Sequence, residues 1–202
     1  MSTDSNLTSA TGKSPRTGLW IALGVAALAV VYFISSGNRL VALEERVNTA
    51  WAQVETVLQR RFDLIPNLVA TVQGYASHEK AILERVTELR SRWNQPGSPS
   101  QKAEIASELE TTLSRLLVVA ENYPDLKANQ NFRDLQVELS GTENRVSVER
   151  QRYNEVAREF NTAIRQFPTS LVAQLRGLNE PKKYFEAAAG AAEAPKVSFP
   201  AG

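Results

Sequence analysis

The chain has 202 residues, of which 43% are hydrophobic, and its 23 basic and 22 acidic residues leave a formal net charge of +1. This balance lacks the strongly basic character of nucleic-acid-binding proteins, so we expect no nucleic-acid partner. Cysteine is absent and histidine occurs once, at His78, which excludes disulfides and thiolate metal sites and leaves little scope for histidine chemistry.

The N-terminal part of the chain is predicted to be a tail followed by a membrane anchor. Residues 1–17 are rich in serine and threonine without apolar periodicity, which is typical of disorder. Thr17 to Asn38 contains no charged residue, and about 20 apolar residues suffice to cross a bilayer. Trp20 and Tyr32 fit the aromatic belts at the two membrane surfaces. We therefore predict that residues 18–38 cross the lipid bilayer once.

A cleaved signal peptide is the alternative interpretation of this stretch. Ala27-Leu28-Ala29 resembles a cleavage site, but five apolar residues, Val30 to Ile34, follow where a polar stretch is expected. An uncleaved anchor is therefore favoured.

The orientation of the anchor is not fixed by charge. Lys13 and Arg16 precede the span and Arg39 and Arg46 follow it, so the count of basic residues is tied. The short tail and the signal-like layout favour an N-terminus inside and the following domain outside.

The first helix after the anchor is predicted over residues 38–76. Its apolar residues recur every three or four positions, which indicates a helix with one buried face. Pro66 removes one hydrogen bond but leaves the phase of the pattern intact, so we favour a kink over a break. The residues expected on the buried face are Leu40, Leu43, Val47, Trp51, Val54, Leu58, Phe62, Ile65, Val69, Val72 and Ala76.

Further helices are predicted beyond a Ser77 cap, with breaks at the Pro/Gly-rich stretch 94–100 and at Pro124. The second is expected to bury Ile82, Val86, Leu89 and Trp93, and the fourth carries a stripe from Phe132 to Phe167 that Pro168 ends. The expected bounds are residues 78–93, 100–122, 127 or 129 to 166, and a short helix 169–176.

These elements predict an all-α fold. An N-terminal transmembrane helix is followed, over residues 39–177, by an antiparallel four-helix bundle with two long helices. Residues 178–202 are expected to be mostly irregular, with Lys196–Phe199 as a segment that could dock on the bundle.

Polar residues lie midway along both long helices, where the two helices are expected to meet. We predict that this polar belt is a network of ion pairs that fixes the register of the helices. Binding of an anionic partner or a lipid headgroup is the alternative. The belt consists of Arg60, Arg61, Asp63, Asn67, Glu143, Asn144, Arg145, Glu149 and Arg152.

Catalytic and metal-binding patterns are not evident. His78-Glu79 begins like a zinc-protease helix, but Ile82 stands where a second histidine would be needed. A di-iron bundle needs two Glu-x-x-His pairs, which one histidine cannot supply. We therefore expect no cofactor, no metal and no catalytic residues.

Several motifs follow one another along the chain. They are Leu58-Gln59-Arg60-Arg61-Phe62-Asp63-Leu64-Ile65-Pro66-Asn67-Leu68-Val69, Gly74-Tyr75-Ala76-Ser77-His78-Glu79, Ala120-Glu121-Asn122-Tyr123-Pro124-Asp125-Leu126-Lys127-Ala128-Asn129, Glu143-Asn144-Arg145, Arg150-Gln151-Arg152-Tyr153-Asn154, Phe160-Asn161, Phe167-Pro168 and Pro195-Lys196-Val197-Ser198-Phe199. In this order, and over about residues 37 to 199, the chain resembles the LemA family. Two departures from the family pattern are Gly37 in place of a usual tyrosine and Phe62 in place of a common histidine.

The resemblance implies one membrane segment, a helical domain of four main helices and no established catalytic residue or cofactor. We expect a bacterial inner (cytoplasmic) membrane, and the short tail with its signal-like layout slightly favours a periplasmic domain. We expect a membrane-anchored scaffold or interaction protein of the cell envelope, with an envelope protein as partner and homo-oligomers possible. An adaptor or regulatory subunit of a membrane protease or transport complex is the alternative.

Overall fold

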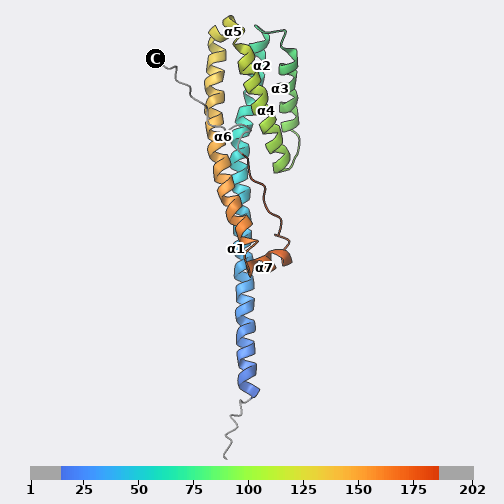
Figure 1. Cartoon of the computed structure of the whole chain (residues 1–202), viewed down its shortest axis with the longest axis vertical. Helices are drawn as coiled ribbons and strands as arrows, with labels where there is room; N and C mark the ends of the chain where they lie inside the picture. The colour runs from blue at the N-terminus through green and yellow to red at the C-terminus, as the bar shows by residue number, and fades with distance from the viewer. Residues whose placement is uncertain (1–14, 187–202) are drawn as a thin grey trace, which may run out of the picture. The chain divides into compact units, whose positions relative to one another are not determined.

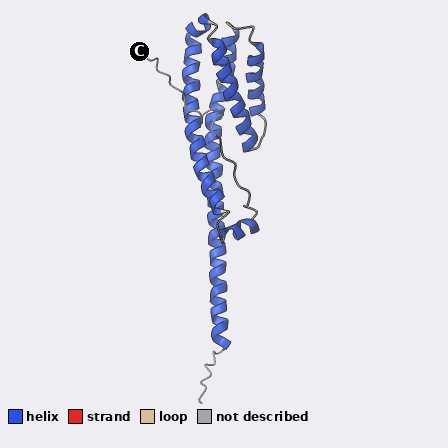
Figure 2. Ribbon diagram, in the orientation of Figure 1, coloured by secondary structure: helices blue, strands red, loops and turns tan. Residues whose placement is uncertain are grey.

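A computed structural model describes residues 15–186, and within this range the chain is all-helical without β-strands (Figures 1 and 2). The all-α prediction is confirmed there. The expected tail lies outside the described residues except for Pro15–Thr17, which begin the first helix, and Lys196–Phe199 also lies outside. The helices are α1 (Pro15–Asp63), α2 (Ile65–Gln73), α3 (Lys80–Trp93), α4 (Pro99–Ala120), α5 (Pro124–Ala128), α6 (Gln130–Ala163) and α7 (Thr169–Leu175).

The chain divides into two compact units, both of which include part of α1. The first unit, Met1–Ala42 with Ala163–Glu180, contains the beginning of α1 and α7. The second unit, Leu43–Thr162 with Pro181–Gly202, contains the rest of α1 and the helices α2 to α5 with nearly all of α6.

The beginning of α1 is apolar on all sides. Its most apolar stretch is not buried within the protein, and by length and composition the helix can cross a membrane. Trp20 is 72% exposed and Leu28 is 72% exposed. An N-terminal apolar helix suited to a single-pass anchor is therefore present.

The junction of α1 and α2 is a single residue, Leu64, which keeps helical dihedral angles. Its amide donates to the Arg61 carbonyl at 3.3 Å, a tightened three-residue turn. Pro66 lies in the first turn of α2, where its missing N–H costs nothing. The interruption is closer to the expected kink than to a break.

The expected stripe of this first helix is largely buried. Two residues differ: Trp51 and Val69 are half-buried, and Leu68 is buried in place of Val69. The tightened turn explains the shift, because overwinding by part of a residue brings the next buried position forward by one.

Helix α3 packs against α2 and α4. A capping box starts α4, with the Ser98 hydroxyl accepting from the Gln101 amide and the Gln101 side chain accepting from the Ser98 amide. The predicted Ser77 cap of α3 was wrong, because α3 begins later, after Glu79 and without a side-chain cap. Accordingly its buried face includes Leu83, whereas Ile82 is only half-buried.

The connection between α4 and α6 contains a further short helix. Residues 124–128 form the short helix α5 rather than only the expected turn. The Tyr123 hydroxyl donates to Glu79 Oε1 at 3.0 Å, and this hydrogen bond raises the pKa of Tyr123. It ties the start of α5 to the start of α3.

Helix α6 buries most of its predicted stripe, including Phe132, Val146 and Phe160. Phe167 was wrongly placed on this stripe, since it is 80% exposed. The reason is that α6 ends at Ala163, so the helical periodicity does not reach it. Gly177, after α7, has a φ of 70°, a conformation that glycine adopts without strain.

Candidate functional site

Two members of the predicted polar belt meet across α1 and α6. Arg61 is 6% exposed and its Nη1 pairs with Glu143 Oε2. Arg61 Nε has no hydrogen-bond partner within the described part of the chain. A buried guanidinium with a single carboxylate partner is held firmly in place, because leaving it unpaired is costly.

The other belt residues do not join this pair. Arg60 pairs at 3.2 Å with Glu138, a residue outside the predicted belt. Arg152 pairs with Glu149 at 2.7 Å within one turn of α6, and Asp63 accepts from Gln59 at 2.8 Å. Asn67, Asn144 and Arg145 are exposed.

Three ion pairs link α1 to α6. Arg46 pairs with Glu159 at 2.7 Å, while Arg60 pairs with Glu138 and Arg61 with Glu143. Arg46 therefore pairs near the end of α6, whereas Arg60 and Arg61, which lie closer to the end of α1, pair within the first half of α6.

A second set of contacts binds an extended segment, Lys182–Phe185, to α6. The Asn161 side chain accepts from the Lys182 amide at 2.7 Å and donates to the Lys182 carbonyl at 2.8 Å. Asn154 does the same for Phe185, at 2.8 and 2.9 Å. Each amide side chain thus substitutes for the edge of a neighbouring β-strand.

The spacing of these contacts follows from helix and strand geometry. Asn154 and Asn161 are seven residues apart, which is about 10 Å along a helix at about 1.5 Å per residue. Lys182 and Phe185 are three residues apart, which is also about 10 Å in an extended chain. Two turns of α6 therefore match three residues of an extended peptide. We call Lys182–Phe185 the docked segment.

The side chains of the docked segment fill separate sites. Lys182 Nζ pairs with Glu44 at 2.8 Å and lies 5.1 Å from the Phe160 ring centroid. Phe185 stacks on Trp51, with centroids 5.8 Å apart and planes 11° apart, and meets Tyr153 edge-on at 5.3 Å. Burial raises the pKa of the Tyr153 hydroxyl.

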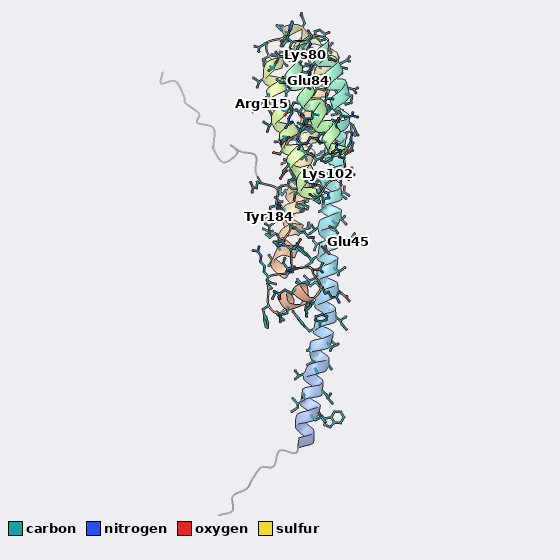
Figure 3. All side chains as sticks on the ribbon, turned by 90° about the vertical axis from the view of Figure 1, so that its right-hand side faces the viewer. Glu45, Lys80, Glu84, Lys102, Arg115 and Tyr184 are labelled. Atoms are coloured by element: carbon teal, nitrogen blue, oxygen red, sulfur yellow. The ribbon has the colours of Figure 1, made fainter. Side chains whose placement is uncertain are left out.

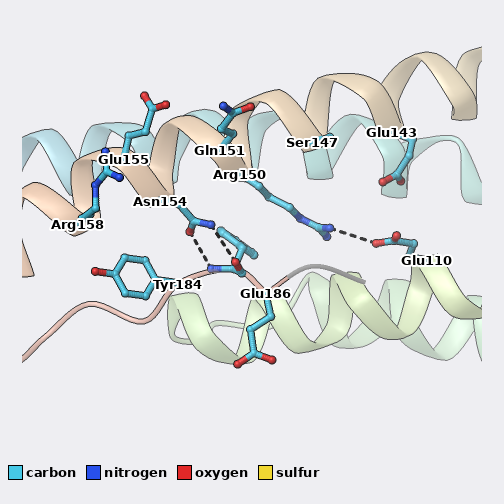
Figure 4. Close-up of a pocket in the computed structure, with 11 residues that line it drawn as sticks. Glu110, Glu143, Ser147, Arg150, Gln151, Asn154, Glu155, Arg158, Tyr184 and Glu186 are labelled. Atoms are coloured by element: carbon cyan, nitrogen blue, oxygen red, sulfur yellow. Dashed lines mark hydrogen bonds and ion pairs between the residues drawn. The ribbon is translucent and has the colours of Figure 1, made fainter. Parts of the chain in front are cut away.

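A groove of about 700 Å³ continues beside the docked segment (Figure 4). Across it, Arg150 of α6 pairs with Glu110 of α4 at 3.2 Å, and the Arg150 guanidinium lies 5.3 Å from the Phe185 ring centroid. Arg150 Nε has no hydrogen-bond partner within residues 15–186. The groove is lined by Glu110, Glu143, Ser147, Arg150, Gln151, Asn154, Glu155, Arg158, Tyr184, Phe185 and Glu186.

The asparagine contacts show that this face of α6 binds an extended segment of the chain through its backbone. Across residues 15–186, no group of three or more His, Asp or Glu residues is placed to hold a metal ion. Elsewhere in the second unit, Lys102 of α4 (labelled in Figure 3) pairs with Glu55 of α1, 5.0 Å from the Trp93 ring centroid. That contact closes the other side of the core.

No role was predicted for Asn154, Asn161 or the docked segment, although the sequence contains one signal for them. Pro181-Lys182-Lys183-Tyr184-Phe185 and Pro195-Lys196-Val197-Ser198-Phe199 share the pattern Pro-Lys-x-x-Phe. Two asparagines seven apart on a helix match the spacing from lysine to phenylalanine in that pattern.

The fold and these contacts define a class of protein: an all-helical domain that follows an apolar helix able to cross a membrane. A sequence model of the LemA family matches residues 50–199, and the chain belongs to this family. The Lys196–Phe199 motif lies within the match.

Named relatives agree with this assignment. Protein LemA of Metamycoplasma hominis is 26% identical over 153 residues, covering 74% of this chain and 70% of that protein. Magnetosome protein MamQ 2 of Paramagnetospirillum magneticum is 24% identical, covering 89% and 76%. Magnetosome protein MamQ of Magnetospirillum gryphiswaldense is 22% identical, covering 83% and 73%. None of these names denotes an enzyme.

Proposed function

We propose that this protein is a membrane-anchored helical scaffold of the bacterial cell envelope, without catalytic activity. The observation that carries the proposal is that one uninterrupted helix, α1, provides both an apolar segment able to cross a bilayer and a buried stripe of the domain. The family membership and the relatives' names support a membrane-associated protein of non-catalytic type.

The domain is proposed to be an antiparallel four-helix bundle with two long helices. The pairing of Arg46 near the end of α6, and of Arg60 and Arg61 within its first half, supports opposite directions for the two long helices. The packing of α3 on α4 supports the bundle. Within it, the Arg61–Glu143 pair fixes the register of the two long helices. The exposed Asn144 and Arg145 fit the alternative role, contact with an anionic partner or headgroup.

The membrane is proposed to be the bacterial inner membrane, with residues 18–38 as the span and the domain in the periplasm. The partner is an envelope protein or a further copy of this chain. Exposed faces of the long helices provide the surface for either.

In-cell crosslinking of the full-length protein, followed by mass spectrometry, tests this proposal. Recurrent capture of one envelope protein, or of the protein itself, is the expected result. A matched control is the same experiment with Leu28→Lys, which places a charge in the span at about 3 kcal/mol of insertion cost. Capture that is unchanged by Leu28→Lys would argue against a function at the membrane. Turnover of ester, phosphate or peptide substrates by the purified protein would overturn the non-catalytic role.

One observation favours the alternative function, an adaptor for a membrane protease or transport complex. Asn154 and Asn161 bind the backbone of the docked segment, so this face of α6 can hold an extended peptide of different sequence that keeps the Lys-to-Phe spacing. A partner with a Pro-Lys-x-x-Phe segment would compete for the same contacts.

Peptide binding distinguishes the adaptor from a purely structural role. A fluorescent peptide with the sequence of residues 194–202 is titrated against the full-length protein in detergent. The adaptor predicts saturable binding that Asn154→Leu abolishes and that Asn144→Leu, an exposed asparagine on the same helix, leaves intact. No binding, or equal loss in both variants, contradicts the adaptor.

A further inference from the structure

Helix α7 carries an exposed apolar face. Leu171 is 52% exposed and Leu175 is 75% exposed, and their spacing of four residues places them on one face of the helix. Phe167, two residues before the helix, is 80% exposed. Among residues 64–186, these three are the only exposed phenylalanine, leucine, isoleucine or tryptophan side chains. Single exposed apolar residues are common, but a cluster on one face marks an interaction surface.

The opposite face of α7 packs against its own unit. Val172 is 3% exposed and Ala173 is 0% exposed, so the helix is fixed while Leu171 and Leu175 face outward. A helix that buries small apolar residues inward and presents large ones outward needs a second apolar environment.

Contacts within the first unit fix α7 at the end of the predicted span. The Tyr32 hydroxyl and the Thr169 hydroxyl are hydrogen-bonded at 3.1 Å, and the Arg176 guanidinium lies 5.9 Å from the Phe33 ring centroid. Gly37 is buried against the same guanidinium, and a Cβ at this position would collide with it. The glycine therefore allows Arg176 to approach α1 closely.

This position coincides with the expected membrane surface. Val31 is 64% exposed and Ile34 is 50% exposed beside these contacts, and the first charged residue after the span is Arg39. Tyr32 is of the residue type that concentrates at membrane interfaces. Helix α7 lies across α1 rather than along it (Figure 1), as expected for a helix in the plane of the interface.

We propose that α7 is a second membrane contact, in which Phe167, Leu171 and Leu175 insert into the interfacial region of the bilayer on the domain side of the span. The exposed Arg165 and Arg176 flank this face and are suited to phosphate headgroups. The inference rests on the membrane anchor of the proposed function and adds a contact that no other part of that proposal requires.

Lipid is favoured over protein as the occupant of this face. The patch is three side chains wide, whereas a stable protein interface uses about 20–30 residues on each side. Its position beside exposed apolar residues of the span makes it continuous with a surface that lipid already covers.

Fluorescence quenching in vesicles tests the proposal, and the absence of native cysteine allows single labelling sites. Full-length Leu171→Cys and Leu175→Cys carry an environment-sensitive dye and are reconstituted into vesicles of three parts phosphatidylethanolamine to one part phosphatidylglycerol. Spin-labelled lipids carry the quencher either near the headgroup or deep in the acyl chain. Both labels are expected to be quenched several-fold more by the shallow quencher than by the deep one.

Two matched sites make each outcome decisive. Leu28→Cys, in the span, should be quenched by the deep lipid, and Val118→Cys, 71% exposed on α4, should be quenched by neither. If Leu28→Cys responds but both α7 labels behave like Val118→Cys, the inference is wrong while the anchor stands. If Leu28→Cys does not respond, the anchor itself fails. Dyes on α7 whose emission is blue-shifted but not quenched by either lipid would mean that protein covers the face, which also overturns the proposal.

A further variant tests whether the side chains of Phe167 and Leu171 hold α7 at the membrane. Phe167→Ser with Leu171→Ser, in the Leu175→Cys background, should reduce shallow quenching to the Val118→Cys level. The urea midpoint should not change, because both replaced side chains are exposed. Undiminished quenching would show that these side chains do not hold α7 at the membrane.

Discussion

The two parts of α1 differ in how one helix meets its surroundings. At the beginning, Leu19, Leu28 and Ile34 are all at least half exposed, and apolar residues occupy every side. After Leu40, most large apolar residues lie on one buried stripe, and the remaining faces carry mainly polar and charged residues, with Val41 as an exposed exception. The comparison shows that the distribution of apolar residues around a helix indicates its surroundings. A helix in lipid is apolar on all sides, whereas a helix that packs on a protein core is apolar along one stripe.

The largest expected effect is a difference in stability between two truncations, one in each part of α1. Phe62 is 0% exposed and stacks on Trp93 with centroids 4.5 Å apart, so Phe62→Ala should cost about 3–5 kcal/mol of unfolding free energy. Leu28→Ala should cost less than about 0.5 kcal/mol. Urea titration of the full-length protein in detergent, followed by circular dichroism, measures both. Equal losses would mean that the apolar part of α1 packs against protein.

The next effect tests the charged faces of the protein-facing part. Glu143→Gln leaves the buried Arg61 without a charged partner, and because Glu143 is itself about one-third exposed we expect a loss of about 1–3 kcal/mol. Arg61→Met removes the buried charge instead and should cost less. The same urea titration compares them. A larger loss for Arg61→Met would show that the pair adds net stability beyond fixing register.

Much of the fold was predictable because the helical stripe depends on local sequence alone. The burial of Leu58, Phe62 and Ile65 follows from spacing, and so does the apolar span. Local changes in helix geometry were not predictable. At Leu64 one tightened turn shifts the buried face, so that Leu68 is buried instead of the predicted Val69. Phe167 was placed on the buried stripe because the sequence predicted that α6 continues up to Pro168. The helix ends earlier, at Ala163.

The site was less predictable because its contacts join residues far apart in the chain. Arg60 and Arg61 are adjacent, yet only the buried one meets a predicted belt residue. The contacts of Asn154 and Asn161 with the docked segment were not predicted, because the spacing of apolar residues gives no information about polar side chains that bind backbone groups. Asn161 lies in the Phe160-Asn161 motif, but this motif does not indicate that the side chain is only 4% exposed or that it binds Lys182.

A smaller effect is expected at the docked segment, which is bound by side chains of the protein-facing region. Asn161→Leu removes two hydrogen bonds to Lys182, worth about 1–2 kcal/mol together. Release of the segment should speed tryptic cleavage after Lys182 and Lys183. Asn144→Leu, an exposed replacement on the same helix, should leave the cleavage rate unchanged. Equal rates in both variants would show that other contacts hold the segment.

The smallest effect is expected at the Arg46–Glu159 pair, which has the same chemistry as Arg61–Glu143 in a different environment. Its side chains are 55% and 49% exposed, so water screens the attraction and a double-mutant cycle with alanine should give about 0.2–1 kcal/mol. Added salt should reduce this coupling, since the Debye length falls to about 3 Å at about 1 M ionic strength. The coupling of Arg61 with Glu143 should be less sensitive to salt, because the Arg61 side chain is 8% exposed. Equal salt dependence of the two couplings would mean that water reaches Arg61 and that burial does not distinguish the pairs.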